Sequence, residues 1–106
     1  MKRLMAIGGV LVLCGAVTAV QPPESFAPEQ ISQGAAIFAR HCSACHGAHM
    51  ADPQAAFDLR RFPRDQKNRF VTAVTRGKDN MPPWGDLLRP EDIEALWAYV
   101  MAGESR

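Results

Sequence analysis

The segment Cys42-Ser43-Ala44-Cys45-His46 constrains this chain more than any other part of it. Two thiols three positions apart lie on one helical turn, and each can form a thioether with a vinyl group of a porphyrin. The adjacent imidazole then lies under the porphyrin iron, where it can act as the proximal ligand. The C-x-x-C-H spacing therefore predicts one covalent haem c, with Cys42 and Cys45 as its tethers and His46 as an axial ligand of the iron.

The same residues have two other interpretations. Cys42 and Cys45 could form a redox-active dithiol, or they could contribute half of a zinc site. Zinc needs about four ligands, and the other strong nitrogen or sulfur ligands of the chain are Cys14, His41 and His49. A thioredoxin-like dithiol follows a strand, and no such run of residues precedes Cys42. The haem interpretation is favoured, and the other two stay open.

The first 19 residues have the organisation of a secretory signal. Lys2 and Arg3 precede an almost wholly apolar stretch at 4–17, and small residues stand where signal peptidase would cut after Ala19. We expect cleavage there and a periplasmic location. The alternative is an uncleaved membrane anchor that faces the periplasm, because the apolar stretch is only slightly shorter than the ~20 residues needed to span a bilayer.

The remaining 87 residues are enough for one small domain. We divide the chain into a signal peptide at 1–19, a flexible leader at 20–30 and a single domain at 31–106. Without Lys2 and Arg3, ten basic residues stand against eleven acidic ones, which excludes a broad nucleic-acid-binding surface. A buried haem would add apolar surface on which so small a domain can pack. We expect a monomer.

Apolar spacing predicts three main helices and no strand. The first covers 31–41, with the haem motif at its C-terminal end and Gly47 as its stop. The second begins near Asp65, a suitable N-cap, and ends at Gly77. The third starts at Pro90, and its apolar side chains recur at i, i+3, i+4 and i+7. This inward-facing stripe consists of Ile93, Leu96, Trp97 and Val100.

In this order the motifs resemble the class I monohaem cytochromes c, and the likeness covers nearly all of the sequence after the signal. The resemblance implies an all-α fold with about three main helices around one covalently bound haem. It also implies that the N- and C-terminal helices cross, with Gly34, Phe38, Leu96 and Tyr99 at the crossing. The family takes its sixth iron ligand from a methionine in the loop before the last helix, and Met81 is the residue at that place.

The residues after Met81 also favour its assignment as the sixth iron ligand. Pro82 and Pro83 restrict the backbone, which limits the loop conformations that could withdraw the thioether from the iron. The alternative is that Met81 only fills a gap in the haem pocket. Met50 follows the proximal ligand too closely to cross the haem, and Met101 lies on the last helix.

Two positions depart from the family. Related bacterial cytochromes commonly have a proline whose carbonyl accepts the N–H of the proximal imidazole, and Phe57 stands in its place here. The carbonyl that accepts the His46 N–H therefore stays open. Arg89 replaces the serine or threonine that often caps the last helix, so Pro90 and the acidic residues after it must begin that helix.

This ligand set implies a function in single-electron transfer. His46 and Met81 together would leave no open position on the iron for a substrate, so we expect an electron carrier rather than an enzyme. A soft thioether ligand favours Fe(II), which predicts a positive, mid-range reduction potential. The alternative is a haem-based sensor of small ligands or a peroxide-reactive protein in which Met81 dissociates, although Asp79 is the only acid near Met81 and no distal base flanks it.

The expected partners are other redox proteins. The stretch Asp58-Leu59-Arg60-Arg61 resembles haem domains that accept electrons from quinoprotein alcohol dehydrogenases. We expect a periplasmic dehydrogenase or another respiratory donor on one side and a terminal oxidase on the other.

Positive charge gathers in one part of the chain, from position 60 to position 78. Asp65 is the only acid there, and this distribution could steer docking to an acidic partner or could form an ordinary solvated helix face. The cations of this basic segment are Arg60, Arg61, Arg64, Lys67, Arg69, Arg76 and Lys78.

Overall fold

The computed structural model describes residues 8–10, 15 and 25–103. It contains three main helices, one short helix and two 3-10 turns, and the described residues form no strand. The elements are α1 (Pro28–His41), α2 (Ser43–His46), η1 (Ala48–Met50), η2 (Leu59–Arg61), α3 (Lys67–Arg76) and α4 (Pro90–Ala102). The predicted all-α class is confirmed.

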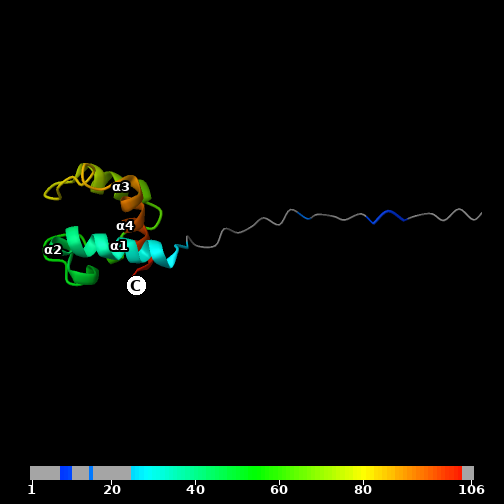
Figure 1. Cartoon of the computed structure of the whole chain (residues 1–106), viewed down its shortest axis with the longest axis horizontal. Helices are drawn as coiled ribbons and strands as arrows, with labels where there is room; N and C mark the ends of the chain where they lie inside the picture. Colours follow the sequence, from blue (N-terminus) through cyan, green and yellow to red (C-terminus); the bar gives the residue numbers. More distant parts are fainter. Residues whose placement is uncertain (1–7, 11–14, 16–24, 104–106) are drawn as a thin grey trace, which may run out of the picture.

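Helices α1 and α4 cross, and theirs is the most extensive contact between elements (Figure 1). Gly34 is buried at this crossing, where a Cβ atom would overlap the carbonyl oxygen of Ala95 and lie 2.8 Å from the Cβ of Tyr99. The ring of Phe38 packs against that of Tyr99 with their centroids 5.2 Å apart, and Leu96 is 1% exposed. The crossing therefore depends on glycine for its close approach and on aromatic packing for its stability.

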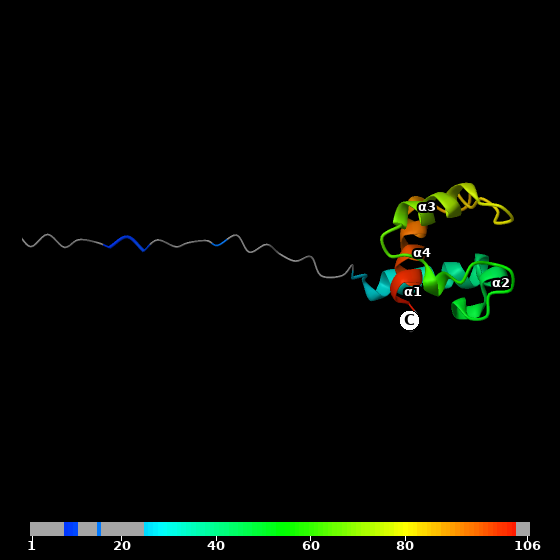
Figure 2. The same ribbon diagram turned by 180° about the vertical axis from the view of Figure 1, so that it is seen from behind.

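Helix α4 is buried on more sides than the single apolar stripe that the sequence predicts. It extends from α3 to α1 and also contacts η2 (Figure 2). A helix that is apolar nearly all round belongs in the middle of a domain, and α4 has this composition. Its buried residues are Ile93, Ala95, Leu96, Trp97, Ala98, Tyr99, Val100 and Met101.

An aromatic cluster joins α3 to α4. The ring of Phe70 on α3 lies 5.2 Å from that of Trp97 on α4, and Phe62 packs edge-on against both at 5.7 and 6.0 Å. At the rim of this contact, Nζ of Lys67 lies 2.6 Å from a carboxylate oxygen of Glu94. These contacts fix α3 against the central helix.

The first helix begins earlier than we predicted. We expected a flexible leader at 20–30 and a helix from residue 31, but α1 begins at Pro28 and Phe26 packs against the core. Phe26 and Ile31 occupy the two positions, N′ and N4, at which apolar side chains staple the start of a helix. Pro28 suits the first helical turn because the free N–H that it lacks would have no partner there. Both features lie in the sequence, and the packing of Phe26 against the core shows that the helix begins with them.

The second main helix begins later than we predicted. We expected α3 to start near Asp65 as N-cap, whereas it starts at Lys67 with Gln66 in the N-cap position. The N–H of Gln66 donates to the carbonyl of Pro63 at 3.2 Å, so a backbone turn precedes the helix. The predicted stop at Gly77 is confirmed, with φ at 78°.

The start of α4 follows the predicted alternative to a serine or threonine cap. The backbone N–H of Arg89 donates to a carboxylate oxygen of Asp92 at 2.9 Å, and Pro90 occupies the first turn. The acidic side chain thus satisfies a backbone donor that a capping hydroxyl would not reach.

Most of the signal segment that we predicted at 1–19, and residues 20–24 of the leader, lie outside the described residues, so those assignments stay predictions. Among the described residues, no helix combines the length and the apolar character that a membrane crossing requires.

The α1–α4 crossing gives a first prediction. Gly34→Ala should lower the free energy of unfolding of the haem protein by about 1–3 kcal/mol or more, because the added methyl group meets backbone that cannot move aside. Denaturant titration measures the loss. Ser32→Ala, at an exposed position of the same helix, is the matched control and should change stability by no more than about 0.5 kcal/mol. Equal midpoints for the two variants would contradict this account of the crossing.

Candidate functional site

The C-x-x-C-H motif lies where α1 gives way to α2. Cys42 is the C-cap of α1, and its carbonyl accepts the backbone N–H of His46 at 3.0 Å and that of Cys45 at 3.3 Å. Cys45 is exposed and Cys42 is half-buried. Gly47 ends α2 with φ at 84°, and a Cβ there would overlap the carbonyl oxygen of Ala51. Both thiols and the imidazole therefore share one turn, which a glycine closes.

The ring of His46 is oriented by a backbone carbonyl. Its Nδ1 lies 3.2 Å from the carbonyl oxygen of Phe57, and a carbonyl can only accept, so Nδ1 carries the proton. The lone pair of the imidazole is then on Nε2, which is the form that an iron ligand needs. The acceptor that the sequence left open is thus the carbonyl of Phe57, at the position where a proline is common.

Met81 stands at the end of a tight backbone turn. The N–H of Lys78 donates to the carbonyl of Met81 at 3.1 Å, and the N–H of Met81 donates to the carbonyl of Lys78 at 2.8 Å. Asp79 within the turn has φ at 52°. A Cβ on the preceding Gly77 would lie 2.7 Å from the carbonyl oxygen of Met81, so only glycine fits beside the turn.

The loop after Met81 is also tied to α3. The N–H of Trp84 donates to the carbonyl of Val74 at 2.8 Å, and that of Gly85 donates to the carbonyl of Thr75 at 3.1 Å. Hydrogen bonds therefore hold the backbone on both sides of Met81. The position of the Met81 backbone, from which its side chain extends, is therefore fixed.

The Met81 loop and the motif lie at the same end of the molecule. Both ribbon views show the loop on the side on which α2 lies (Figures 1 and 2). The ring of His41, directly before the motif, lies 5.1 Å from the ring of Trp84. The structure thus brings together two segments that are separated by about half of the domain.

Burial separates Met81 from the other methionines of the described residues. Met50 is 0% exposed and Met101 is 1% exposed, and both belong to the hydrophobic core. Met81 lies at the edge of that core with part of its surface exposed. Its thioether is the one that could reach a ligand without unpacking the core.

Cys42 does not have the character of a reactive thiol. Burial, with a smaller contribution from the nearby Cys45, raises the pKa of Cys42 to about 11. Redox-active cysteines have lowered pKa values, because the thiolate is the reacting form. In residues 25–103 no three His, Cys, Asp or Glu side chains are grouped so that they could hold a metal ion, and Cys14 lies outside the described residues. The described residues therefore fit covalent haem attachment better than either alternative.

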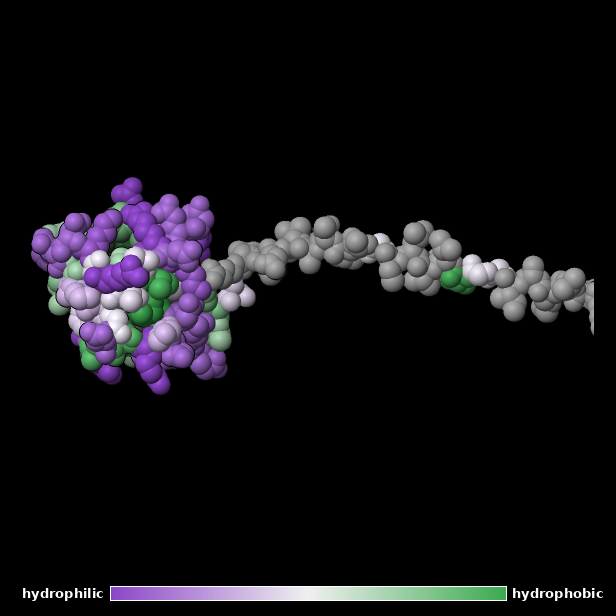
Figure 3. Space-filling view, turned by 90° about the horizontal axis from the view of Figure 1, so that it is seen from above, coloured by the Kyte–Doolittle hydropathy of each residue, from purple (hydrophilic) through white to green (hydrophobic). Residues whose placement is uncertain are grey.

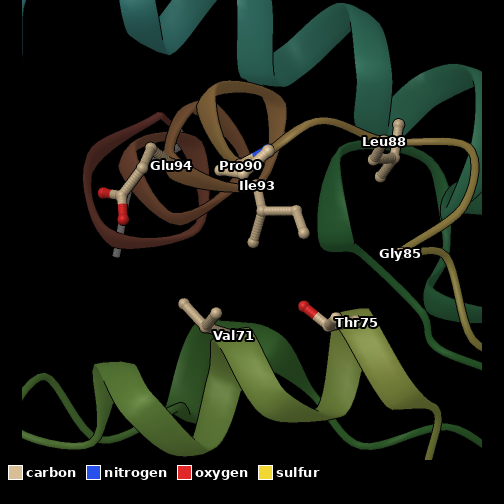
Figure 4. A pocket seen from close by; sticks show the side chains of 7 residues that line it. All are labelled: Val71, Thr75, Gly85, Leu88, Pro90, Ile93 and Glu94. Carbon is tan, nitrogen blue, oxygen red and sulfur yellow. The ribbon is translucent and has the colours of Figure 1, made fainter.

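A separate cavity of about 160 Å³ lies between α3 and the first half of α4 (Figure 4). Val71 and Thr75 line it from α3, and Pro90 and Ile93 line it from α4. Its lining includes Thr75 and Gly85, which tie the Met81 loop to α3, but no residue of the motif or of the turn at 78–81.

Known proteins resemble this chain over the whole helical domain. A family model described as "Cytochrome C oxidase, cbb3-type, subunit III" matches residues 29–100. Cytochrome c6 of Microcystis aeruginosa is 38% identical over 65% of this chain and 91% of its own length. No solved structure matches the chain significantly.

Two larger proteins contain a similar segment. Quinohemoprotein alcohol dehydrogenase ADH IIB of Pseudomonas putida is 33% identical over 83% of this chain, and the cbb3-type cytochrome c oxidase subunit FixP of Sinorhizobium medicae is 33% identical over 68% of it. The chain spans only 13% of the dehydrogenase and 29% of the oxidase subunit. These likenesses therefore concern only a part of each protein.

The motif geometry gives a second prediction. Protein made in a periplasm with haem-attachment machinery should exceed the polypeptide mass by one haem, and alkylation after unfolding should find neither Cys42 nor Cys45 free. Cys45→Ser should leave one thioether, whereas Ser43→Ala between the thiols should keep both. Intact mass spectrometry measures each result, and two alkylated motif thiols in the wild-type protein would contradict haem attachment.

Proposed function

The chain belongs to the class I monohaem cytochromes c, and on that premise we propose that it is a periplasmic single-electron carrier whose iron is bound by His46 and Met81. Its cofactor is one covalent haem c with its iron, and it carries electrons rather than acting as an enzyme. The observation that carries the ligand proposal is the closed turn at Met81, joined by two backbone hydrogen bonds to Lys78.

When bound, the haem supplies an Fe(III)/Fe(II) couple. The residues of this chain hold the ligands still while the oxidation state changes. The carbonyl of Phe57 keeps the His46 ring in one orientation, and the turn beside Lys78 does the same for the Met81 backbone. Since neither ligand has to move, little reorganisation accompanies the gain or loss of one electron.

The ligands and their surroundings also favour the reduced state. A thioether stabilises Fe(II), and apolar side chains disfavour the additional charge of Fe(III). Leu59 and Trp84 are partly buried and pack against the core near the candidate site, whereas the ring of Phe57 is 52% exposed. A positive, mid-range reduction potential is the expected result.

The similar proteins support a position between a dehydrogenase and an oxidase. One relative is named a quinohemoprotein alcohol dehydrogenase and another a cbb3-type oxidase subunit. We infer that the donor is a periplasmic dehydrogenase of the quinoprotein class and that the acceptor is a terminal oxidase. A cleaved signal places the carrier in the periplasm, and an uncleaved one would anchor it to the membrane facing the same compartment.

The basic segment at 60–78 supports docking to an acidic surface. Seen from the side on which α3 lies, the surface is largely hydrophilic around a smaller apolar area (Figure 3). Lys67 is paired with Glu94 and Arg60 with Asp58, and every cation of the segment except Lys67 is exposed. These exposed cations are Arg60, Arg61, Arg64, Arg69, Arg76 and Lys78.

Removal of the thioether is the direct test of the ligand proposal. The oxidised wild-type protein should show the methionine-to-iron charge-transfer band, and the reduced protein should not bind carbon monoxide. Met81→Ala should lose the band, bind carbon monoxide and have a reduction potential lower by on the order of 0.1 V. Absorption spectra and a redox titration measure all three properties.

Met101→Leu is the control for this test, because it removes a buried thioether from the core at little loss of volume. It should keep the band and the potential of the wild-type protein. A band that survives in Met81→Ala would contradict ligation by Met81. A wild-type protein without the band that readily binds carbon monoxide would instead favour a sensor or peroxide-reactive protein.

Charge steering gives a further prediction. Oxidation by ferricyanide, an anionic probe, should slow by roughly twofold to tenfold between ~10 mM and ~200 mM salt, because salt screens attraction to the basic segment. The double variant Arg76→Gln, Lys78→Gln should lose part of this salt dependence. Arg40→Gln, an exposed position of α1 outside the segment, should retain it. Stopped-flow rates that do not depend on salt would rule out steering.

A further inference from the structure

The carbonyl that contacts His46 belongs to a segment held in place on both sides. The ring of Phe57 packs edge-on against Phe62 at 6.2 Å, and Phe62 is only 8% exposed. On the other side, Asp58 begins the turn η2, and its carbonyl accepts the N–H of Arg61 at 3.0 Å. The Phe57 carbonyl therefore lies between an aromatic contact and a backbone turn.

A bidentate ion pair closes that turn. Nε of Arg60 donates to Oδ1 of Asp58 at 3.0 Å, and a terminal guanidinium nitrogen donates to Oδ2 at 3.2 Å. The backbone N–H of Arg60 also donates to Oδ1 at 3.0 Å. Three donors from one residue thus fix both carboxylate oxygens, and these hydrogen bonds hold the pKa of Asp58 below its usual value. Such two-point contacts define geometry more narrowly than a single charged contact does.

We propose that the Asp58–Arg60 pair is a positioning device that holds the Phe57 carbonyl against Nδ1 of His46 and thereby lowers the reduction potential of the haem. Phenylalanine leaves φ free where a proline ring would fix it, so the rigidity of this backbone must come from contacts such as this pair. A well-placed acceptor makes the imidazole a stronger electron donor, which stabilises Fe(III). The inference rests on the proposed function, in which His46 is an iron ligand.

The test compares two conservative substitutions in the haem protein. Arg60→Lys keeps the positive charge but loses the planar fork that grips Asp58. Arg61→Lys makes the same chemical change at a neighbouring exposed cation whose side chain forms no hydrogen bond or ion pair with the described residues. Since charge is preserved in both variants, a difference between them reports the loss of the planar guanidinium of Arg60.

We expect Arg60→Lys to raise the reduction potential above that of the wild-type protein. Its His46 Nδ1–H, followed by NMR of the reduced protein, should exchange with solvent roughly twofold to fivefold faster, the range that loss of a partly exposed ion pair allows. Arg61→Lys should match the wild-type protein in both measurements. Identical potentials and exchange rates in the two variants would overturn the positioning role.

The failure of the proposed function has a different signature. If the wild-type protein lacks the methionine-to-iron band, the His46 and Met81 ligand set is wrong, whatever the two arginine variants do. The exchange rate of the His46 ring proton still decides the positioning role in that case, because it reports the hydrogen bond to Phe57 directly.

Discussion

The close approach of α1 and α4 at Gly34 is the constraint on which the remaining structure depends. A side chain there would meet the backbone of α4 at Ala95, and packed interiors do not adjust to such an overlap without moving a whole helix. The end of α1 at Cys42 carries the haem motif, and α4 begins shortly after the turn of Met81. The angle and depth of one helix crossing therefore set the positions of both candidate ligand segments.

Main-chain hydrogen bonds hold both candidate iron ligands. The Phe57 carbonyl orients the ring of His46. The two backbone hydrogen bonds between Lys78 and Met81 hold the backbone of Met81. Main-chain groups are present whatever residue occupies a position. This is why Phe57 can stand where a proline is common without removing the acceptor that the imidazole needs.

The sequence predicted the features that depend on the type of a single residue, such as a helix end at a glycine or a helix start at a proline. The C-x-x-C-H spacing, the stop at Gly77 and the start at Pro90 are of this kind, and the helices lie where they indicate. The prediction failed where packing or a backbone turn decides. Phe26 packs against the core although it stands among polar residues and prolines, and Asp65 precedes a turn instead of capping α3. The acceptor at Phe57 could not be predicted, because every residue has a backbone carbonyl and the residue type does not show which one faces His46.

The hydrogen bonds from Trp84 and Gly85 to the carbonyls of Val74 and Thr75 have a consequence for how the iron could exchange its sixth ligand. They make the last turn of α3 and the loop of Met81 one cooperative unit, because neither can leave its place while those bonds persist. In the proposed ligand set, departure of the Met81 thioether from the iron then has the character of local unfolding. Its rate would rise steeply with temperature, and dilute denaturant would promote it well before the α1–α4 core opens.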